Sequence, residues 1–379
     1  MPSSAPRQEA LGRATTITSL NVKSPLGEVA PTATTSIPSG DISTIQYLRG
    51  VAALMVVFAH ANDQFKTATH VALRDIGWSG VDLFFLISGF VMTYTTATHN
   101  YTQRRFFLRR LARIAPLYWL MTLLTATLVI LIPQFFQTTR FSWDMLIHSL
   151  AFIPLWDATR QNFSPLLHLG WTLDYEMYFY FWFTLLLWLN PMRRAFSLTA
   201  IFGIVTFIGS YLVSPSNALA FYADNVTFEF IFGCFIGAAY CLGWCHRAPQ
   251  GLVVAALAIS VPALLLGSVL DHELENRALL RGIPAAVIVF ALISSKQARA
   301  FQSRWLHVLG DATYSIYLTH IFVVMGIHKI WTSAHIPTFE AANYLFVAIC
   351  LVSAALVGVA TYEACERRLN AFAKRLLAV

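Results

Sequence analysis

Long apolar runs recur through most of this sequence and limit what it can fold into. A helix needs about twenty apolar residues to cross a bilayer, and helices can do so because their backbone groups are paired within the segment. We find ten runs of roughly that length, at 45–62, 79–97, 114–133, 172–189, 196–213, 226–245, 251–270, 279–295, 314–333 and 341–363. The sequence therefore predicts an all-α fold, a polytopic membrane helix bundle with about ten transmembrane helices.

The composition excludes an ordinary soluble protein. Hydrophobic residues make up 57% of the chain and charged residues only 12%, about half the charged fraction of soluble domains. The net charge of +7 fits topology signals better than a nucleic-acid surface, because no basic tract with interleaved aromatic residues stands in a soluble segment. The five cysteines show no disulfide or zinc spacing, so no metal site is predicted.

Two regions differ in character. Residues 1–40 are rich in Ser, Thr, Pro and Ala and contain no apolar run long enough for a signal peptide, so we expect a disordered N-terminal tail. Residues 41–379 form one predicted membrane domain. Within it, the stretch 143–156 is apolar but short and is interrupted by Asp144 and His148, which favours a re-entrant or interfacial helix.

Lysine and arginine set the expected orientation. Alternate connections, counted with both termini on one side, hold 18 of these residues, whereas the opposite side holds 7. Because cytoplasmic loops carry the basic excess, we expect both termini in the cytoplasm.

The first span places two costly side chains in an apolar run, "YLRGVAALMVVFAHA". Arg49 and His60 are eleven residues apart, which is about 16 Å and almost three helical turns, so they lie on one stripe. Arg49 is near the cytoplasmic end and His60 lies in the outer third. A snorkelling arginine and a hydrogen-bonded packing histidine are the simpler alternative. Two polar groups on one face favour a polar path through the membrane.

Carboxylates are expected at the depth of His60. Asp82 stands in the outer part of the second span, and Asp174 and Glu176 stand near the start of the fourth. Helix capping is an alternative for Asp82 and Asp174 but explains Glu176 less well. We therefore expect His60 to be the catalytic base, oriented by Glu176 or Asp82.

An arginine-rich connection, "RRFFLRRLARIAP", stands on the cytoplasmic side. Orientation and contact with anionic lipid could explain it, but guanidinium groups also bind phosphates in bidentate fashion. A phosphorylated donor could bind here through Arg104, Arg105, Arg109, Arg110 and Arg113.

A late motif, "LGDATYSIYLTHIFVV", begins the ninth span. Asp311 is interpreted as an N-cap, and a lone buried histidine such as His320 is more often a packing group than a chemical one. Glu363 and Glu366, at the depth of Arg49, could neutralise it. The candidates for lining a substrate channel are Ser88, Tyr314, Ser315 and His320.

Together these segments resemble integral-membrane acyltransferase family 3, particularly its exopolysaccharide-type O-acetyltransferases. The resemblance covers residues 41 to about 368 and rests on "LRGVAALMVVFAH", "GVDLFFLISGF", "RRLARIAPLYW", "WTLDYEMYFY" and "GDATYSIYLTH" in order. It implies a ten-span fold in a bacterial-type inner (plasma) membrane and an acyl-CoA donor, with acetyl-CoA expected, on the cytoplasmic side. The acceptor would be a sugar hydroxyl of a polysaccharide or lipid-linked glycan. The family's functional residues map onto Arg49, His60, Glu176 and the run from Arg104 to Arg113.

Under this hypothesis the arginines bind the phosphates of CoA and His60 takes the proton of the attacking sugar hydroxyl. A transient acyl-histidine stays open. Two other functions also stay open: a transporter or flippase for a lipid-linked saccharide, and a structural subunit of an envelope assembly.

Overall fold

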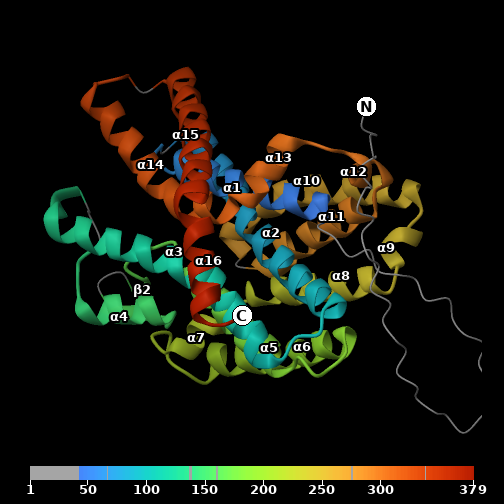
Figure 1. Ribbon diagram of the computed structural model, residues 1–379. Helices are drawn as coiled ribbons and strands as arrows, with labels where there is room; N and C mark the ends of the chain where they lie inside the picture. Colours follow the sequence, from blue (N-terminus) through green and yellow to red (C-terminus); the bar gives the residue numbers. More distant parts are fainter. Residues whose placement is uncertain (1–41, 66, 136–138, 159–160, 275, 338) are drawn as a thin grey trace, which may run out of the picture. The chain divides into compact units, whose positions relative to one another are not determined.

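The computed structural model describes residues 42–379 except 66, 136–138, 159–160, 275 and 338. The expected tail, residues 1–40, lies outside this range. The described chain is almost entirely helical (Figure 1), and its elements are α1 (Ser43–Asn62), α2 (Ala68–Thr98), α3 (Gln103–Leu131), α4 (Trp143–Ala151), β1 (Trp156–Asp157), β2 (Asn162–Phe163), α5 (Gly170–Leu185), α6 (Pro191–Tyr211), α7 (Ala218–Tyr222), α8 (Thr227–Cys241), α9 (Trp244–Arg247), α10 (Gln250–Leu274), α11 (Ile283–Ser294), α12 (Lys296–Ala300), α13 (Arg304–Asp311), α14 (Thr313–Ser333), α15 (Glu340–Thr361) and α16 (Arg367–Leu376).

The all-α membrane fold is confirmed, and each of the ten predicted runs coincides with a helix. Within the described residues, seven helices are long and apolar enough to cross a membrane, or eight if α13 and α14 count as one bent span. The remaining two runs are α5, with 16 residues, and the apolar helix Ala278–Ser294. The count of ten is therefore approximate. The short stretch after residue 143 forms α4, a nine-residue helix, followed by a small antiparallel β-ladder.

Glycines bring α2 into backbone contact with α8. A Cβ atom on Gly89 would lie 1.9 Å from the carbonyl oxygen of Phe230, and one on Gly233 would lie 2.0 Å from that of Leu86. Gly237, four residues after Gly233, packs on Thr93 in the same way. Small residues at this spacing let membrane helices approach closely, and the gain there comes from van der Waals contact rather than from the hydrophobic effect.

The junction of α13 and α14 is bent by 75°. Gly310 lies at this bend, and a Cβ atom on it would lie 2.3 Å from the carbonyl oxygen of Gln46 on α1. Asp311 ends α13 and accepts a hydrogen bond from the amide of Gln46 (2.5 Å). Its interpretation as an N-cap is wrong, because α14 begins after Ala312 without a side-chain cap. The bend docks the start of α14 against the first turns of α1.

An arginine binds the carbonyl groups that directly follow the short helix α5. Arg194 on α6 is buried, and its guanidinium donates to the carbonyl oxygens of Leu186, Leu187 and Leu189. The guanidinium also stacks on Phe183, 4.5 Å from the ring centroid. Unpaired terminal carbonyls inside an apolar region are costly, so this contact allows a 16-residue helix to end within the bundle.

Contacts between helix ends agree with the alternating direction of the spans. Thr44 at the start of α1 bonds to Ala298 on α12 (3.4 Å), and α16 packs along the start of α3. These basic segments were all assigned to one side by the charge count. At the opposite ends, Ser79 on α2 bonds to Ser268 on α10 (2.6 Å).

The glycine contact between α2 and α8 predicts that a larger residue at Gly233 destabilises the protein. Gly233→Ala should lower the thermal unfolding temperature in detergent, because the new methyl group overlaps a backbone carbonyl and overpacking costs about 1–3 kcal/mol. Gly203→Ala on α6 is the matched control, since nothing lies within 4 Å of its Cβ position. Equal unfolding temperatures for the two variants would contradict the close approach.

Candidate active site

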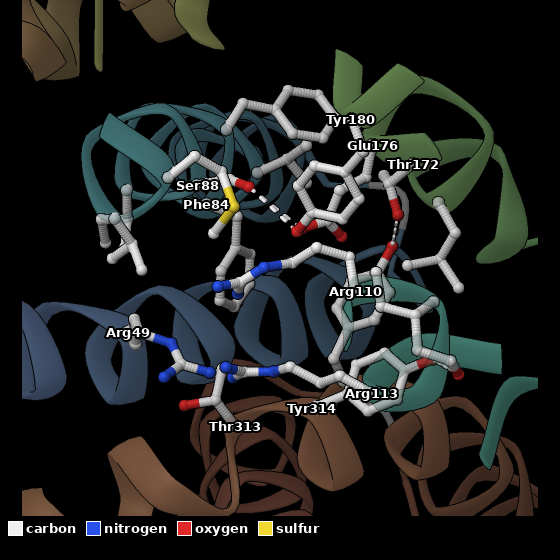
Figure 2. A pocket seen from close by; sticks show the side chains of 18 residues that line it. Arg49, Phe84, Ser88, Arg110, Arg113, Thr172, Glu176, Tyr180, Thr313 and Tyr314 are labelled. Atoms are coloured by element: carbon white, nitrogen blue, oxygen red, sulfur yellow. Dashed lines mark hydrogen bonds between the residues drawn. The ribbon is translucent and has the colours of Figure 1, made fainter. Parts of the chain in front are cut away.

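A cavity of roughly 820 Å³, counting the part open to solvent, lies among α1, α2, α3, α5 and the start of α14. This volume is in the range of small-molecule sites. Its lining combines apolar side chains with charged and polar ones, most of which are labelled in Figure 2. The charged and polar lining residues are Arg49, Ser88, Arg110, Arg113, Thr172, Glu176, Tyr180, Thr313, Tyr314 and Tyr317.

Three guanidinium groups converge in this cavity. Figure 2 shows Arg49 on α1 meeting Arg110 and Arg113, which are three residues apart on α3 and therefore share one helical face. Arg49 donates to Gln46 (3.1 Å). Arg110 has a buried Nε without a hydrogen-bond partner. None of the three forms an ion pair within the described part of the chain, which leaves positive charge available for an anion.

Glu176 is the one carboxylate in the lining. It accepts hydrogen bonds from Ser88 (3.0 Å) and Tyr180, and Ser88 and Tyr180 are also bonded to each other (3.3 Å). Glu176 attracts Arg49 and Arg110 electrostatically. With three cations against one carboxylate, the cavity has an excess of positive charge.

The predicted arginine connection is not a separate loop helix but the first turns of α3. Of its five arginines, only Arg110 and Arg113 line the cavity. Arg104 and Arg105 are exposed, and Arg109 bonds to the hydroxyl of Tyr101 (3.0 Å). The helix thus divides the cluster into a cavity-facing pair and an outer group suited to lipid headgroups.

His60 does not line this cavity. Its Nδ1 lies 3.1 Å from the carbonyl oxygen of Val56 and 3.2 Å from Nε2 of His320, and its ring packs edge-on against Trp78. No hydrogen bond joins His60 to Glu176 or Asp82 among the described residues. The expectation that one of these carboxylates orients His60 is wrong in this structure, because His320 occupies that place.

Tyr317 lines the cavity and also contacts His320, the partner of His60 in the histidine pair. It is part of the cavity lining, and its carbonyl oxygen lies 2.6 Å from Nδ1 of His320. Its hydroxyl is bonded to Thr172 (2.7 Å) and its ring packs against Phe84. The cavity that holds Arg49 therefore does not extend to His60, and Tyr317 is a lining residue that contacts His320.

Asp82 belongs to a separate buried charge cluster. Its Oδ1 lies 2.6 Å from Nε of Arg277, and the carboxylate of Glu229 lies 3.6 Å from the same nitrogen. Asp82 and Glu229 are fully buried. Capping does not explain Asp82, because α2 begins at Ala68, nor Asp174, which is the fifth residue of α5. We interpret Asp82 as a counter-ion of Arg277.

The remaining channel candidates separate into two groups. Ser88 and Tyr314 line the cavity, and the hydroxyl of Tyr314 donates to the carbonyl oxygen of Ile114 (2.7 Å). Ser315 and His320 are fully buried outside the lining. Ser315 donates to Glu366 (2.6 Å).

Of the two glutamates expected to neutralise Arg49, Glu366 attracts it without a direct ion pair, whereas Glu363 pairs with Arg367.

Sequence reasoning missed several residues of the site, among them Tyr180, Thr172 and Trp78. Tyr180 stands four residues after Glu176 on the same helix, and this spacing could have identified it. Thr172 and Trp78 carry no such signal, because their roles depend on contacts with other helices.

Comparison with known proteins identifies the family of this chain. The acyltransferase domain model of the acyltransferase 3 family matches residues 42–363. This chain belongs to the acyltransferase 3 family. It is 31% identical over 308 residues to the exopolysaccharide production protein ExoZ of Rhizobium meliloti, covering 80% of this chain and 92% of ExoZ. No solved structure matches.

A second relative is the O-acetyltransferase OatA of Staphylococcus aureus, 23% identical over 328 residues. The match covers 77% of this acyltransferase and 52% of OatA, so it spans about half the length of the staphylococcal protein. Membership of an acyltransferase family makes the chain an enzyme and argues against the transporter and structural-subunit alternatives. The several membrane-length helices make it a multi-pass membrane acyltransferase.

The position of Asp82 in this acyltransferase predicts a structural role. Asp82→Asn should lower the thermal unfolding temperature strongly, because breaking a buried ion pair costs about 3–5 kcal/mol. Asp144→Asn is the matched control, since Asp144 pairs with His148 on the surface of α4 with 68% of its side chain exposed.

Adding Arg277→Gln to Asp82→Asn should restore part of the loss. An Asp82→Asn protein that unfolds like the wild type yet has no acyltransferase activity would instead support a catalytic role.

Proposed function

We propose that this chain is an O-acetyltransferase that moves an acetyl group from cytoplasmic acetyl-CoA to a hydroxyl of an exported or cell-surface polysaccharide. The observation that carries the proposal is the cavity in which Arg49, Arg110 and Arg113 converge without ion pairs. Partly buried cations without an ion pair favour an anionic partner. A donor with several phosphates supplies one, and a planar guanidinium suits phosphate oxygens.

The cytoplasmic side of the donor is supported by charge. The start of α3 and the adjacent α16 are the most basic segments of the chain, and basic segments favour the cytoplasm. Arg110 and Arg113 lie in these first turns of α3. We therefore place both termini in the cytoplasm and the protein in the inner membrane.

Glu176 and its partners can hold the neutral part of the donor. Ser88 and Tyr180 keep the carboxylate oriented within the cavity, and Glu176 can accept hydrogen bonds from the amide groups of a pantetheine arm. The acyl end of such an arm would approach His60 past Tyr317, because Tyr317 lines the cavity and also contacts His320.

His60 can act as the general base. A neutral imidazole takes the proton of the sugar hydroxyl as its oxygen bonds to the acyl carbon, the carbon–sulfur bond breaks, and the proton passes to the departing thiolate. The acceptor class is inferred from the relatives: one is named for exopolysaccharide production and another as an O-acetyltransferase. Lipid-linked and free polysaccharide have the same hydroxyl chemistry.

The donor site is tested by a charge-preserving pair. Arg110→Lys with Arg113→Lys should raise the KM for acetyl-CoA by about 10-fold or more, since the loss of two guanidinium forks exceeds ~1.4 kcal/mol. The matched pair Arg104→Lys with Arg105→Lys should stay within about 2-fold, because these residues are exposed. KM is measured with labelled acetyl-CoA on purified protein. An unchanged KM in both pairs would favour contact with lipid.

The catalytic base is tested in cells. His60→Ala should abolish acetylation of the polysaccharide made by the producing strain, because the proposed general base is then missing. The acetyl content of the extracted polysaccharide is the measurement, and Western blotting of membranes controls for protein level. Full acetylation by this variant would refute the assignment of His60.

A further inference from the structure

The hydrogen bonds of the histidine pair, His60 and His320, indicate which ring nitrogen of each residue is protonated. The proposed reaction does not use this feature. His320 is completely buried on α14, and both of its ring nitrogens have partners. Its Nδ1 lies 2.6 Å from the carbonyl oxygen of Tyr317. A carbonyl oxygen can only accept, so the proton of a neutral His320 is on Nδ1. Its Nε2 is then a lone-pair acceptor.

That acceptor faces His60. Nε2 of His320 lies 3.2 Å from Nδ1 of His60, and the carbonyl oxygen of Val56 lies 3.1 Å from the same nitrogen. Two acceptors converge on Nδ1 of His60, so the proton of its neutral ring is on that atom. The lone pair of His60 is then on Nε2, which has no hydrogen-bond partner among the described residues.

We propose that His320 is a positioning residue that holds His60 as the Nδ1-protonated tautomer, with a basic Nε2 free for the acceptor hydroxyl. This inference rests on the proposed function. The series of hydrogen bonds runs from His60 to His320 and from His320 to the carbonyl oxygen of Tyr317. A buried carboxylate orients the catalytic histidine of a serine hydrolase in a comparable way. His320 stays neutral throughout: the hydroxyl proton moves to Nε2 of His60 and then to the departing CoA thiolate.

This arrangement has a further effect on the charged state. When His60 takes the proton, its Nδ1–H donates to two acceptors, and hydrogen bonds that involve a charged donor are about twice as strong as neutral ones. The ring also packs edge-on against Trp78, with centroids 4.8 Å apart, which limits its rotation. A packing histidine would need neither the short bond to Tyr317 nor an acceptor aimed at His60.

The test compares replacements of His320. His320→Leu removes the acceptor, whereas the amide oxygen of His320→Gln can still accept from His60. We expect His320→Leu to lower kcat by about 10²-fold, the lower end of what general-base catalysis contributes, with the KM for acetyl-CoA unchanged. His320→Gln should retain activity within about 10-fold of the wild type.

The matched control is His328→Leu, eight residues further along α14, where the histidine ring packs against Phe346; it should leave kcat unchanged. The assay uses purified full-length protein, labelled acetyl-CoA and polysaccharide extracted from a strain that lacks the gene.

A spectroscopic measurement tests the tautomer directly. In protein labelled with ¹⁵N at histidine, the His60 signals are identified by their loss in His60→Ala. Wild-type protein should show a non-protonated Nε2 and a protonated Nδ1 for His60, and His320→Leu should show a mixture of tautomers. A His60 ring protonated on Nε2 in the wild type would overturn the inference.

The outcomes separate the two proposals. If the purified wild-type protein transfers no acetyl group from acetyl-CoA, the proposed function fails, whatever the tautomer. If the wild type is active and His60→Ala retains full acetylation, His60 is not the base and the inference about its tautomer is overturned. If His60→Ala is inactive but His320→Leu has wild-type kcat, only the role of His320 is overturned. If His320→Leu and His320→Gln lose activity equally and both keep the wild-type His60 tautomer, His320 is a packing residue and the inference is overturned.

Discussion

The close approach of α2 to its neighbours on two sides is the contact on which the rest of the structure depends. Gly77 and Gly80 bring α2 against the backbone of α1, and Gly89 brings it against α8. Dispersion contact at this range is collectively large in a bilayer. Because Ser88, Phe84 and Trp78 all project from α2, the same approach sets the distances within both the cavity and the histidine pair.

Much of the fold could be predicted from the sequence, because an apolar run of membrane length has few alternatives. Each predicted run coincides with a helix, and the short interfacial helix was also expected. The count could not be settled by length alone, because α5 has only 16 residues. Arg194, in the first turn of α6, binds the carbonyl groups of Leu187 and Leu189 that follow α5. Such a contact leaves no periodic signal.

The sequence predicted which residues belong to the site better than it predicted which of them contact each other. Arg49, Ser88, Glu176 and Tyr314 do line one cavity, as residue type and depth suggested. Depth along a helix axis, however, does not fix which way a side chain points around it. Glu176 was expected at the depth of His60 but lies in the cavity with Arg49, and the partner of His60 is His320 on α14.

The position of Tyr317 has a consequence for how the acyl donor is protected from water. An enzyme that transfers acyl groups has to keep water away from its donor, because hydrolysis of the donor competes with the transfer. Tyr317 lines the cavity next to His320, its hydroxyl bonds to Thr172 and its ring packs against Phe84. If the proposed transfer takes place at His60, an acyl group held in the cavity has to move past Tyr317 first, so this one side chain would decide how often a bound donor reacts.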